Sequence, residues 1–101
     1  MTVYRNEGLW DASNVEFSEG RVLVYDKKNK TPRMKHIDYG LGAFHASVFT
    51  SLPDEGVHDL AQVYKSALMR NQLAAYETPD RFYEIGSPEG VQSLSDYLLT
   101  Q

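Results

Sequence analysis

The sequence predicts one domain of mixed α and β structure, of the α/β or α+β class. Three observations lead to this prediction. The chain has 101 residues, the length of a small domain, and its content of 42% hydrophobic and 24% charged residues is that of a globular protein. Strand-like segments, some with apolar residues at every second position, are interspersed with segments whose apolar residues recur every three or four. No repeat, linker or low-complexity stretch divides the chain, so residues 1–101 are expected to form a single unit.

Strands are predicted where apolar residues alternate, or follow one another, between turn residues. The clearest pair is a hairpin with its turn at residues 19–20. In the second strand of this hairpin, Val22 and Val24 should face one way, and Leu23 and Tyr25 the other. The predicted strands are residues 2–5, 14–18, 21–26, 36–44, 73–77 and 81–85, with loops over residues 6–13 and 26–35 and a short helix over residues 46–52.

Two longer helices are predicted from spacing and capping residues. Residues 57–69 carry one apolar stripe, with Asp59 in the first turn and Arg70 near the end, as the helix dipole favours. Ser87 followed by Pro88 predicts the N-cap and first residue of the last helix. The apolar face of this last helix consists of Val91, Leu94, Leu98 and Tyr97.

Charge and residue content exclude several classes of function. Ten basic residues against fourteen acidic ones give a net charge of −4, which disfavours nonspecific binding of nucleic acid, and no aromatic residue lies within the basic segment 27–35. There is no cysteine, and the three histidines lack zinc-site spacing. The N-terminus lacks the features of a signal peptide, and no apolar run approaches the roughly 20 residues of a membrane helix. A cytoplasmic protein with neither a nucleic-acid nor a membrane partner is expected.

A first candidate site is Glu84, between a predicted strand and the helix start at Ser87. Carboxylates at such positions in α/β proteins lie where ligands bind, and Mg²⁺ is typically held by one or two carboxylates. The N–H groups of the helix N-terminus can also bind an anion. The alternative is that Glu84 is a solvated residue and that Ser87 and Pro88 only begin the helix.

Two further candidate sites lie on predicted strands, one at the end of a strand and one in the interior of another. Asp26 can accept hydrogen bonds from sugar hydroxyls, and Lys27 can meet a phosphate; the alternative is a charged loop after a hairpin. Asp38 precedes Gly40 and Gly42, and glycine within a strand permits close approach of a sugar or a flat ligand to the main chain. The alternative is that these glycines mark a bulge or a packing position.

Three stretches occur in a suggestive order: RVLVYDKK, then HIDYGLGAF, then RFYEIGSPEG. Together with MTVYRNEGLWDASNVEF, this order resembles the C-terminal half of the sugar-phosphate nucleotidyltransferases, the nucleoside-diphosphate-sugar pyrophosphorylases. These include mannose-1-phosphate and heptose-1-phosphate guanylyltransferases and glucose-1-phosphate thymidylyltransferases. The resemblance covers nearly the whole chain. It implies the C-terminal part of a Rossmann-like, three-layer α/β/α fold with a mixed sheet. It also implies a reaction in which a sugar 1-phosphate attacks a nucleoside triphosphate with the help of Mg²⁺.

The resemblance assigns roles to individual residues. Asp26 stands where the family usually has Glu, in contact with a sugar hydroxyl, and Lys27 matches the lysine that meets the sugar phosphate, a catalytic role. Asp38 stands where Asn is common, near the sugar, and Gly40 allows the main chain to approach. Glu84 stands where Asp is common, as one of two carboxylate ligands of Mg²⁺.

The glycine-rich loop with which the family binds the nucleoside triphosphate does not occur in these 101 residues. The other metal-binding Asp of the family belongs to the same missing half. We therefore expect a fragment that is inactive alone and that associates with an N-terminal half or with itself. Two alternatives stay open: a non-catalytic binding or self-associating module that retains part of the fold, and an unrelated small α+β protein.

Overall fold

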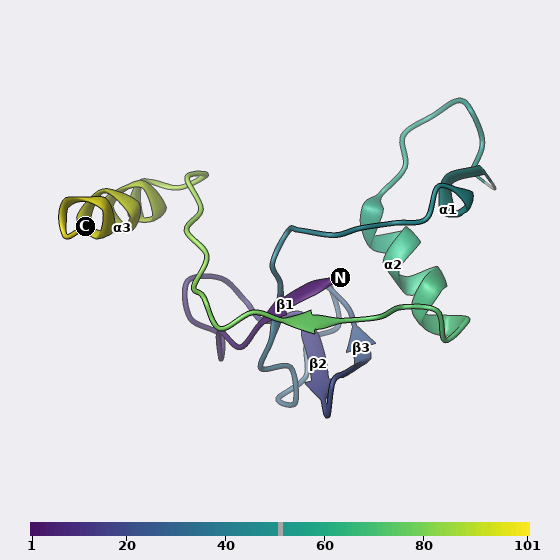
Figure 1. The fold of residues 1–101 in the computed structure, drawn as a ribbon, viewed down its shortest axis with the longest axis horizontal. Helices are drawn as coiled ribbons and strands as arrows, with labels where there is room; N and C mark the ends of the chain where they lie inside the picture. Colours follow the sequence, from purple (N-terminus) through teal and green to yellow (C-terminus); the bar gives the residue numbers. More distant parts are fainter. Residues whose placement is uncertain (51) are drawn as a thin grey trace.

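The structure is a computed structural model that describes residues 1–50 and 52–101. The fold is mixed α/β, as predicted, with two small sheets and helices beside them (Figure 1). Within the described residues, no helix is long and apolar enough to cross a membrane. The elements are β1 (Thr2–Tyr4), β2 (Val15–Ser18), β3 (Arg21–Tyr25), β4 (Ile37–Asp38), α1 (Ser47–Thr50), α2 (Leu60–Met69), β5 (Tyr76–Glu77) and α3 (Pro88–Leu99).

β1 is the central strand of a mixed three-stranded sheet with the order β4-β1-β5. It runs antiparallel to β4 and parallel to β5. The antiparallel pair β2-β3 forms the second sheet, and the two sheets meet where Val15 and His36 form an antiparallel bridge. The Asp38 N–H also donates to the side-chain oxygen of Asn14 at 3.0 Å. The hairpin therefore continues the structure beyond β4, whereas β5 forms the opposite edge.

The β2-β3 hairpin confirms the predicted turn but not the predicted alternation. Residues 19–20 both have positive φ, as a two-residue hairpin turn of this kind requires. Leu23 has no partner on β2 and forms a β-bulge, which shifts the side-chain pattern by one residue. As a result Val22 and Tyr25 are buried on the same side, and Val24 is exposed.

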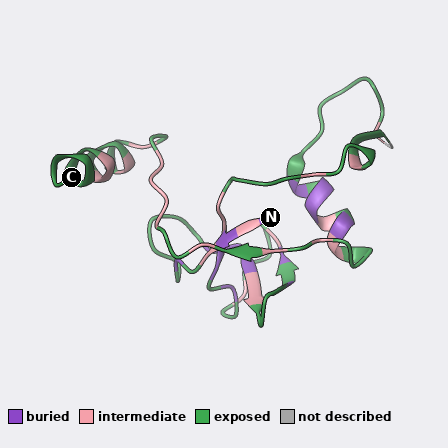
Figure 2. Ribbon diagram, in the orientation of Figure 1, coloured by how far each residue is buried: buried purple, intermediate pink, exposed green. Residues whose placement is uncertain are grey.

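The core lies between the sheets and α2. This helix begins at Leu60, later than predicted, because the Asp59 carboxylate accepts a hydrogen bond from the Ala61 N–H at 2.9 Å and acts as the N-cap. Tyr64 of α2 packs edge-on against Tyr25 of β3, with ring centroids 5.8 Å apart. The buried core cluster consists of Met1, Val3, Val15, Val22, Tyr25, Ala61 and Tyr64 (Figure 2).

Three predicted strands are shorter than expected or absent. Of residues 36–44 only Ile37–Asp38 form a strand, preceded by the bridge residue His36, and of residues 73–77 only Tyr76–Glu77 form one. Residues 81–85 do not form a strand at all. A strand needs a neighbour to pair its main-chain groups, and the described chain places no strand beside residues 81–85. Local composition alone cannot supply that neighbour.

α3 extends away from the sheets (Figure 1). The predicted cap is confirmed, since the Ser87 hydroxyl accepts a hydrogen bond from the Gly90 N–H at 3.0 Å. None of the residues of α3 is buried, however, and Leu98 on its predicted apolar face is 58% exposed. The radius of gyration of 15.1 Å accordingly exceeds the roughly 13 Å of a compact chain of this length.

Candidate functional site

Asp26, directly after β3, is held by the loop that follows it. Its carboxylate accepts hydrogen bonds from the main-chain N–H groups of Lys28 and Asn29 at 2.8 and 3.0 Å, and Lys65 of α2 lies 3.5 Å away. The N–H groups of Asn29 and then Lys28 hold the pKa of the Asp26 carboxyl well below its ordinary value. Asp26 is therefore ionised at neutral pH, and its neighbour Lys27 is exposed.

Asp38, at the end of β4, lies near two buried tyrosines. Burial, and after it the charge of Asp38, raises the pKa of the Tyr25 and Tyr64 hydroxyls, so both stay protonated at neutral pH. The Gly40 N–H donates to Asp38 Oδ1 at 3.0 Å. Gly40 has a φ of +87°, and no other group lies within 4 Å of the position that a Cβ would take. The main chain beside Asp38 is thus open at Gly40, and the approach of a sugar to it stays a prediction.

Gly42 has a different role from Gly40. A Cβ at Gly42 would collide with the Tyr64 hydroxyl. The same Cβ would also lie very close to the ring of Phe44. Gly42 is therefore a packing position against α2, the second of the two interpretations that the sequence left open.

Glu84 closes the N-terminus of α3. Its Oε2 accepts the Gly86 N–H and its Oε1 accepts the Ser87 hydroxyl, both at 2.7 Å. A side chain at Gly90 would collide with both the carboxylate and the main-chain carbonyl of Glu84. The position that we predicted for an external anion at this N-terminus is thus occupied by the protein's own carboxylate, which suits the helix dipole.

The fit of a metal ion at Glu84 is partial. In the part of the chain that the structure describes, no group of three or more His, Asp or Glu side chains is placed to hold a metal ion. Each oxygen of Glu84 accepts one hydrogen bond, which leaves further lone pairs on the carboxylate. Glu84 can therefore supply one ligand to Mg²⁺, and the remaining ligands would have to come from other groups.

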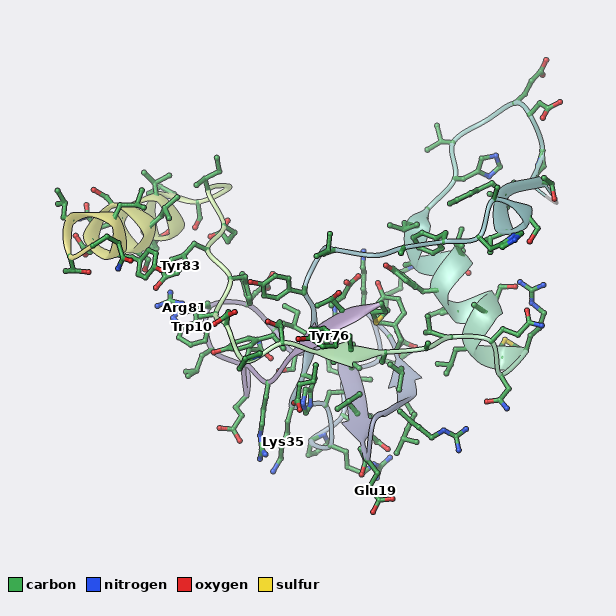
Figure 3. All side chains as sticks on the ribbon, viewed as in Figure 1. Trp10, Glu19, Lys35, Tyr76, Arg81 and Tyr83 are labelled. Atoms are coloured by element: carbon green, nitrogen blue, oxygen red, sulfur yellow. The ribbon has the colours of Figure 1, made fainter. Side chains whose placement is uncertain are left out.

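A column of stacked side chains, which the sequence did not predict, joins α3 to the loop of residues 6–13. The Arg81 guanidinium lies 3.9 Å from the ring centroid of Trp10 and 4.4 Å from that of Tyr83. Tyr83 in turn stacks on Tyr97 of α3 at 4.7 Å. Figure 3 shows Trp10, Arg81 and Tyr83 together at the base of the α3 arm. We call these four side chains the Arg81 column.

The Arg81 column is held by ring faces rather than by hydrogen bonds. Among the described residues, the buried Arg81 Nε has no hydrogen-bond partner. Cation–π contacts of this kind contribute about 0.5–2 kcal/mol each. A signal for the column was present in the sequence: in an extended segment Arg81 and Tyr83, two residues apart, share one side of the chain.

The loop of residues 6–13 positions Trp10. The buried Asn6 amide donates to the carbonyls of Leu9 and Asp11 at 3.2 and 2.8 Å, and its Oδ1 accepts the Ser13 hydroxyl at 2.6 Å. This network fixes the loop, in which Trp10 has a φ of +68°. A buried polar residue thus sets the place of an aromatic side chain at the base of the arm.

The predicted site residues do not line one common cavity. Asp26 lines a groove of about 560 Å³ that also contains Lys65. Glu84 lines a smaller cavity of about 80 Å³ that also contains Arg81. Asp38 lines neither of them. The described chain therefore holds these candidate residues in separate places, Asp26 and Glu84 at different cavities and Asp38 at neither.

Comparison with known proteins adds no relative: no protein-family model, curated protein or solved structure matches this chain.

Proposed function

We propose that this chain supplies the sugar-phosphate side of a nucleotidyltransferase, in which a sugar 1-phosphate and a nucleoside triphosphate give a nucleotide sugar and pyrophosphate. The observation that carries the proposal is the end of β4. There the half-buried carboxylate of Asp38 is followed by open main chain at Gly40. Neighbouring sugar hydroxyls can donate to such a carboxylate while the sugar ring lies against the main chain.

Lys27 is proposed to bind the phosphate group. Its ammonium is exposed, and the loop that carries it is fixed by the hydrogen bonds of Asp26. A lysine ammonium is a compact positive charge that can meet phosphate oxygens from several directions. In the reaction this charge would hold the attacking phosphate near the triphosphate and lower the repulsion between the two anions.

Glu84 is proposed as one carboxylate ligand of Mg²⁺. When bound, the metal ion neutralises charge that develops on the transferred phosphoryl group. Residues 1–101 contain no glycine-rich triphosphate loop, so the proposal places the nucleotide-binding groups on residues outside this chain. It follows that the chain alone should not catalyse nucleotidyl transfer. The proposed fold of the complete enzyme is the Rossmann-like three-layer sandwich, and the mixed pairing on either side of β1 supports it.

Binding of a sugar 1-phosphate to the full chain tests the proposal. We expect saturable shifts of the amide NMR signals of Lys27, Asp38 and Gly40 on titration with mannose 1-phosphate, and smaller shifts with mannose alone. Lys27→Ala should weaken binding about tenfold or more, since a hydrogen bond to a charged group contributes about 1.5–3 kcal/mol. Lys30→Ala, an exposed lysine of the same loop, is the matched control and should change binding little.

Two results would contradict the proposal. One is the absence of binding to mannose, heptose and glucose 1-phosphates alike. The other is binding that Lys27→Ala and Lys30→Ala weaken to the same extent, since that would indicate a general effect of positive charge. A separate assay with nucleoside triphosphate and Mg²⁺ should show no turnover by the chain alone.

A further inference from the structure

β5 is an open sheet edge with unused main-chain groups. The N–H groups of Tyr76 and Thr78 donate to carbonyls on the β1 side at 3.0 and 2.9 Å. Because successive residues of a strand point their main-chain groups to opposite sides, the N–H and C=O groups of Ala75 and Glu77 point away from β1. In the described chain no strand lies beyond β5.

The two edges of this sheet differ in how far they are protected against pairing with another strand. At the β4 edge, the Asn14 side chain accepts the Asp38 N–H, and the bridge between Val15 and His36 extends the pairing. At the β5 edge, the two paired residues are Tyr76 and Glu77, and neither is a lysine or a proline. Glu77 is charged, but its carboxylate contacts His36 Nε2 at 2.6 Å. Pro79, the next outward position, has no N–H, so the usable edge ends there.

The β5 edge is complementary to itself. We propose that a second copy of this chain pairs antiparallel with β5, with the two-fold axis at Tyr76. In that register Ala75 of each copy lies opposite Glu77 of the other, and each such pair can exchange two hydrogen bonds. No two carboxylates face each other directly. Tyr76, which is 66% exposed, lies opposite its own copy as a cross-strand aromatic pair.

Apolar surface beside the β5 edge also favours pairing with a second copy of the chain. Tyr76 lines a groove of about 490 Å³ that continues along Leu73, Phe44 and Val48 into the core. Figure 3 shows Tyr76 on the β5 ribbon, with α3 on one side of the view and α2 on the other. A second copy seated on β5 would cover the rim of this groove in both chains. The paired segment is short, so we expect a dimer whose population rises with protein concentration. This inference does not depend on the proposed nucleotidyltransferase function.

Cross-linking tests the register, because the natural chain has no cysteine. Residues opposite each other in a non-hydrogen-bonded antiparallel pair have Cα atoms about 4.5 Å apart, which a disulfide can span. Under mild oxidation, Tyr76→Cys should form a covalent dimer much faster than Met69→Cys, a control position that is 88% exposed on α2. Equal cross-linking of the two variants would overturn the proposed axis.

Substitutions of opposite charge at Tyr76 test the pairing in solution, with dimerisation measured by sedimentation. The wild-type chain should dimerise with rising concentration. Tyr76→Lys and Tyr76→Glu should each weaken dimerisation roughly tenfold or more, because like charges then face each other across the axis. An equal mixture of the two variants should restore it. A wild-type chain that stays monomeric, or a mixture no better than either variant alone, would overturn the proposal. Unchanged circular dichroism is expected, since the Tyr76 side chain lies outside the core cluster.

Discussion

α2 and α3 carry apolar stripes of the same kind, but only α2 buries one. Ala61, Val63, Tyr64 and Ala67 of α2 are buried, whereas no residue of α3 is buried. The difference shows that an amphipathic pattern specifies a helix and its apolar face, but not the surface that covers the face. That surface must come from elsewhere in the chain or from another molecule.

The two regions are consequently held in different ways. The body, residues 1–80, is held by a core in which Val3 and Val15 are completely buried. The arm, residues 81–101, is held at its base by the Arg81 column and by Phe82, whose ring packs edge-on against Tyr4 and Tyr39. Burial of a large apolar side chain typically stabilises by about 1.5–3 kcal/mol, and the body has many such residues. The arm relies on a few stacked contacts.

The largest expected effect comes from placing a charge in the body. Val3→Asp puts a carboxylate with no partner at the centre of the core, which should cost about 4 kcal/mol or more. Because small domains have about 5–15 kcal/mol in total, we expect loss of most of the cooperative urea unfolding transition followed by circular dichroism. Leu98→Asp in the arm is the matched change and should alter stability by about 0.5 kcal/mol or less. Equal destabilisation by both would mean that the face of α3 is covered.

The same contrast explains how much of the fold the sequence could predict. Turn and cap residues act locally, so the hairpin turn at residues 19–20 and the helix cap at Ser87 were predicted correctly. The bulge at Leu23 depends on how two strands pair, and the strand expected at residues 81–85 depends on a neighbour that the described chain does not provide. Both of these features are set by contacts between distant segments.

In the candidate site, too, local features could be predicted from the sequence, whereas contacts between distant segments could not. The open main chain at Gly40 follows from a local glycine with positive φ, a feature that the sequence can indicate. The hydrogen bonds that occupy Asp26 and Glu84 come from their own loops, and a closer reading of the turn residues around them could have indicated both. The contact between Arg81 and Trp10 spans most of the chain, and single-sequence patterns cannot predict such a contact.

Alkaline pH should act on the body, through Tyr25. Burial and the charge of Asp38 raise the pKa of this hydroxyl above the ordinary value of 10.0. As the pH rises above 10, the unfolded chain loses the proton first, so the unfolded state binds fewer protons and stability falls. The contribution of the Tyr25 proton to the free energy of unfolding is complete below pH 10. It is lost as the pH approaches the pKa of Tyr25 in the folded state. Tyr25→Phe should therefore show a shallower loss of unfolding free energy above pH 10, measured by urea unfolding at a series of pH values. If the unfolding free energy of Tyr25→Phe falls with pH as steeply as that of the wild-type chain, Tyr25 is not the group responsible.

The smallest expected effect concerns the attachment of the arm. Arg81→Ala removes the cation between Trp10 and Tyr83, a change of about 0.5–2 kcal/mol. Because the column touches few core residues, the urea transition of the body should stay nearly the same. The arm should become more accessible, so chymotrypsin should cleave at Tyr83 sooner, and the fluorescence of Trp10, the single tryptophan, should change.

Two further variants separate stacking from charge in this last experiment. Arg81→Lys keeps the positive charge but lacks the planar group that stacks on rings, so it should resemble Arg81→Ala if stacking holds the arm. Arg21→Ala removes an exposed arginine that donates to the Asn71 side chain, and it should leave cleavage at Tyr83 unchanged. If Arg81→Ala also leaves cleavage unchanged, the column is not what attaches α3. The contrast between a body held by burial and an arm held by stacking would then be wrong for the arm.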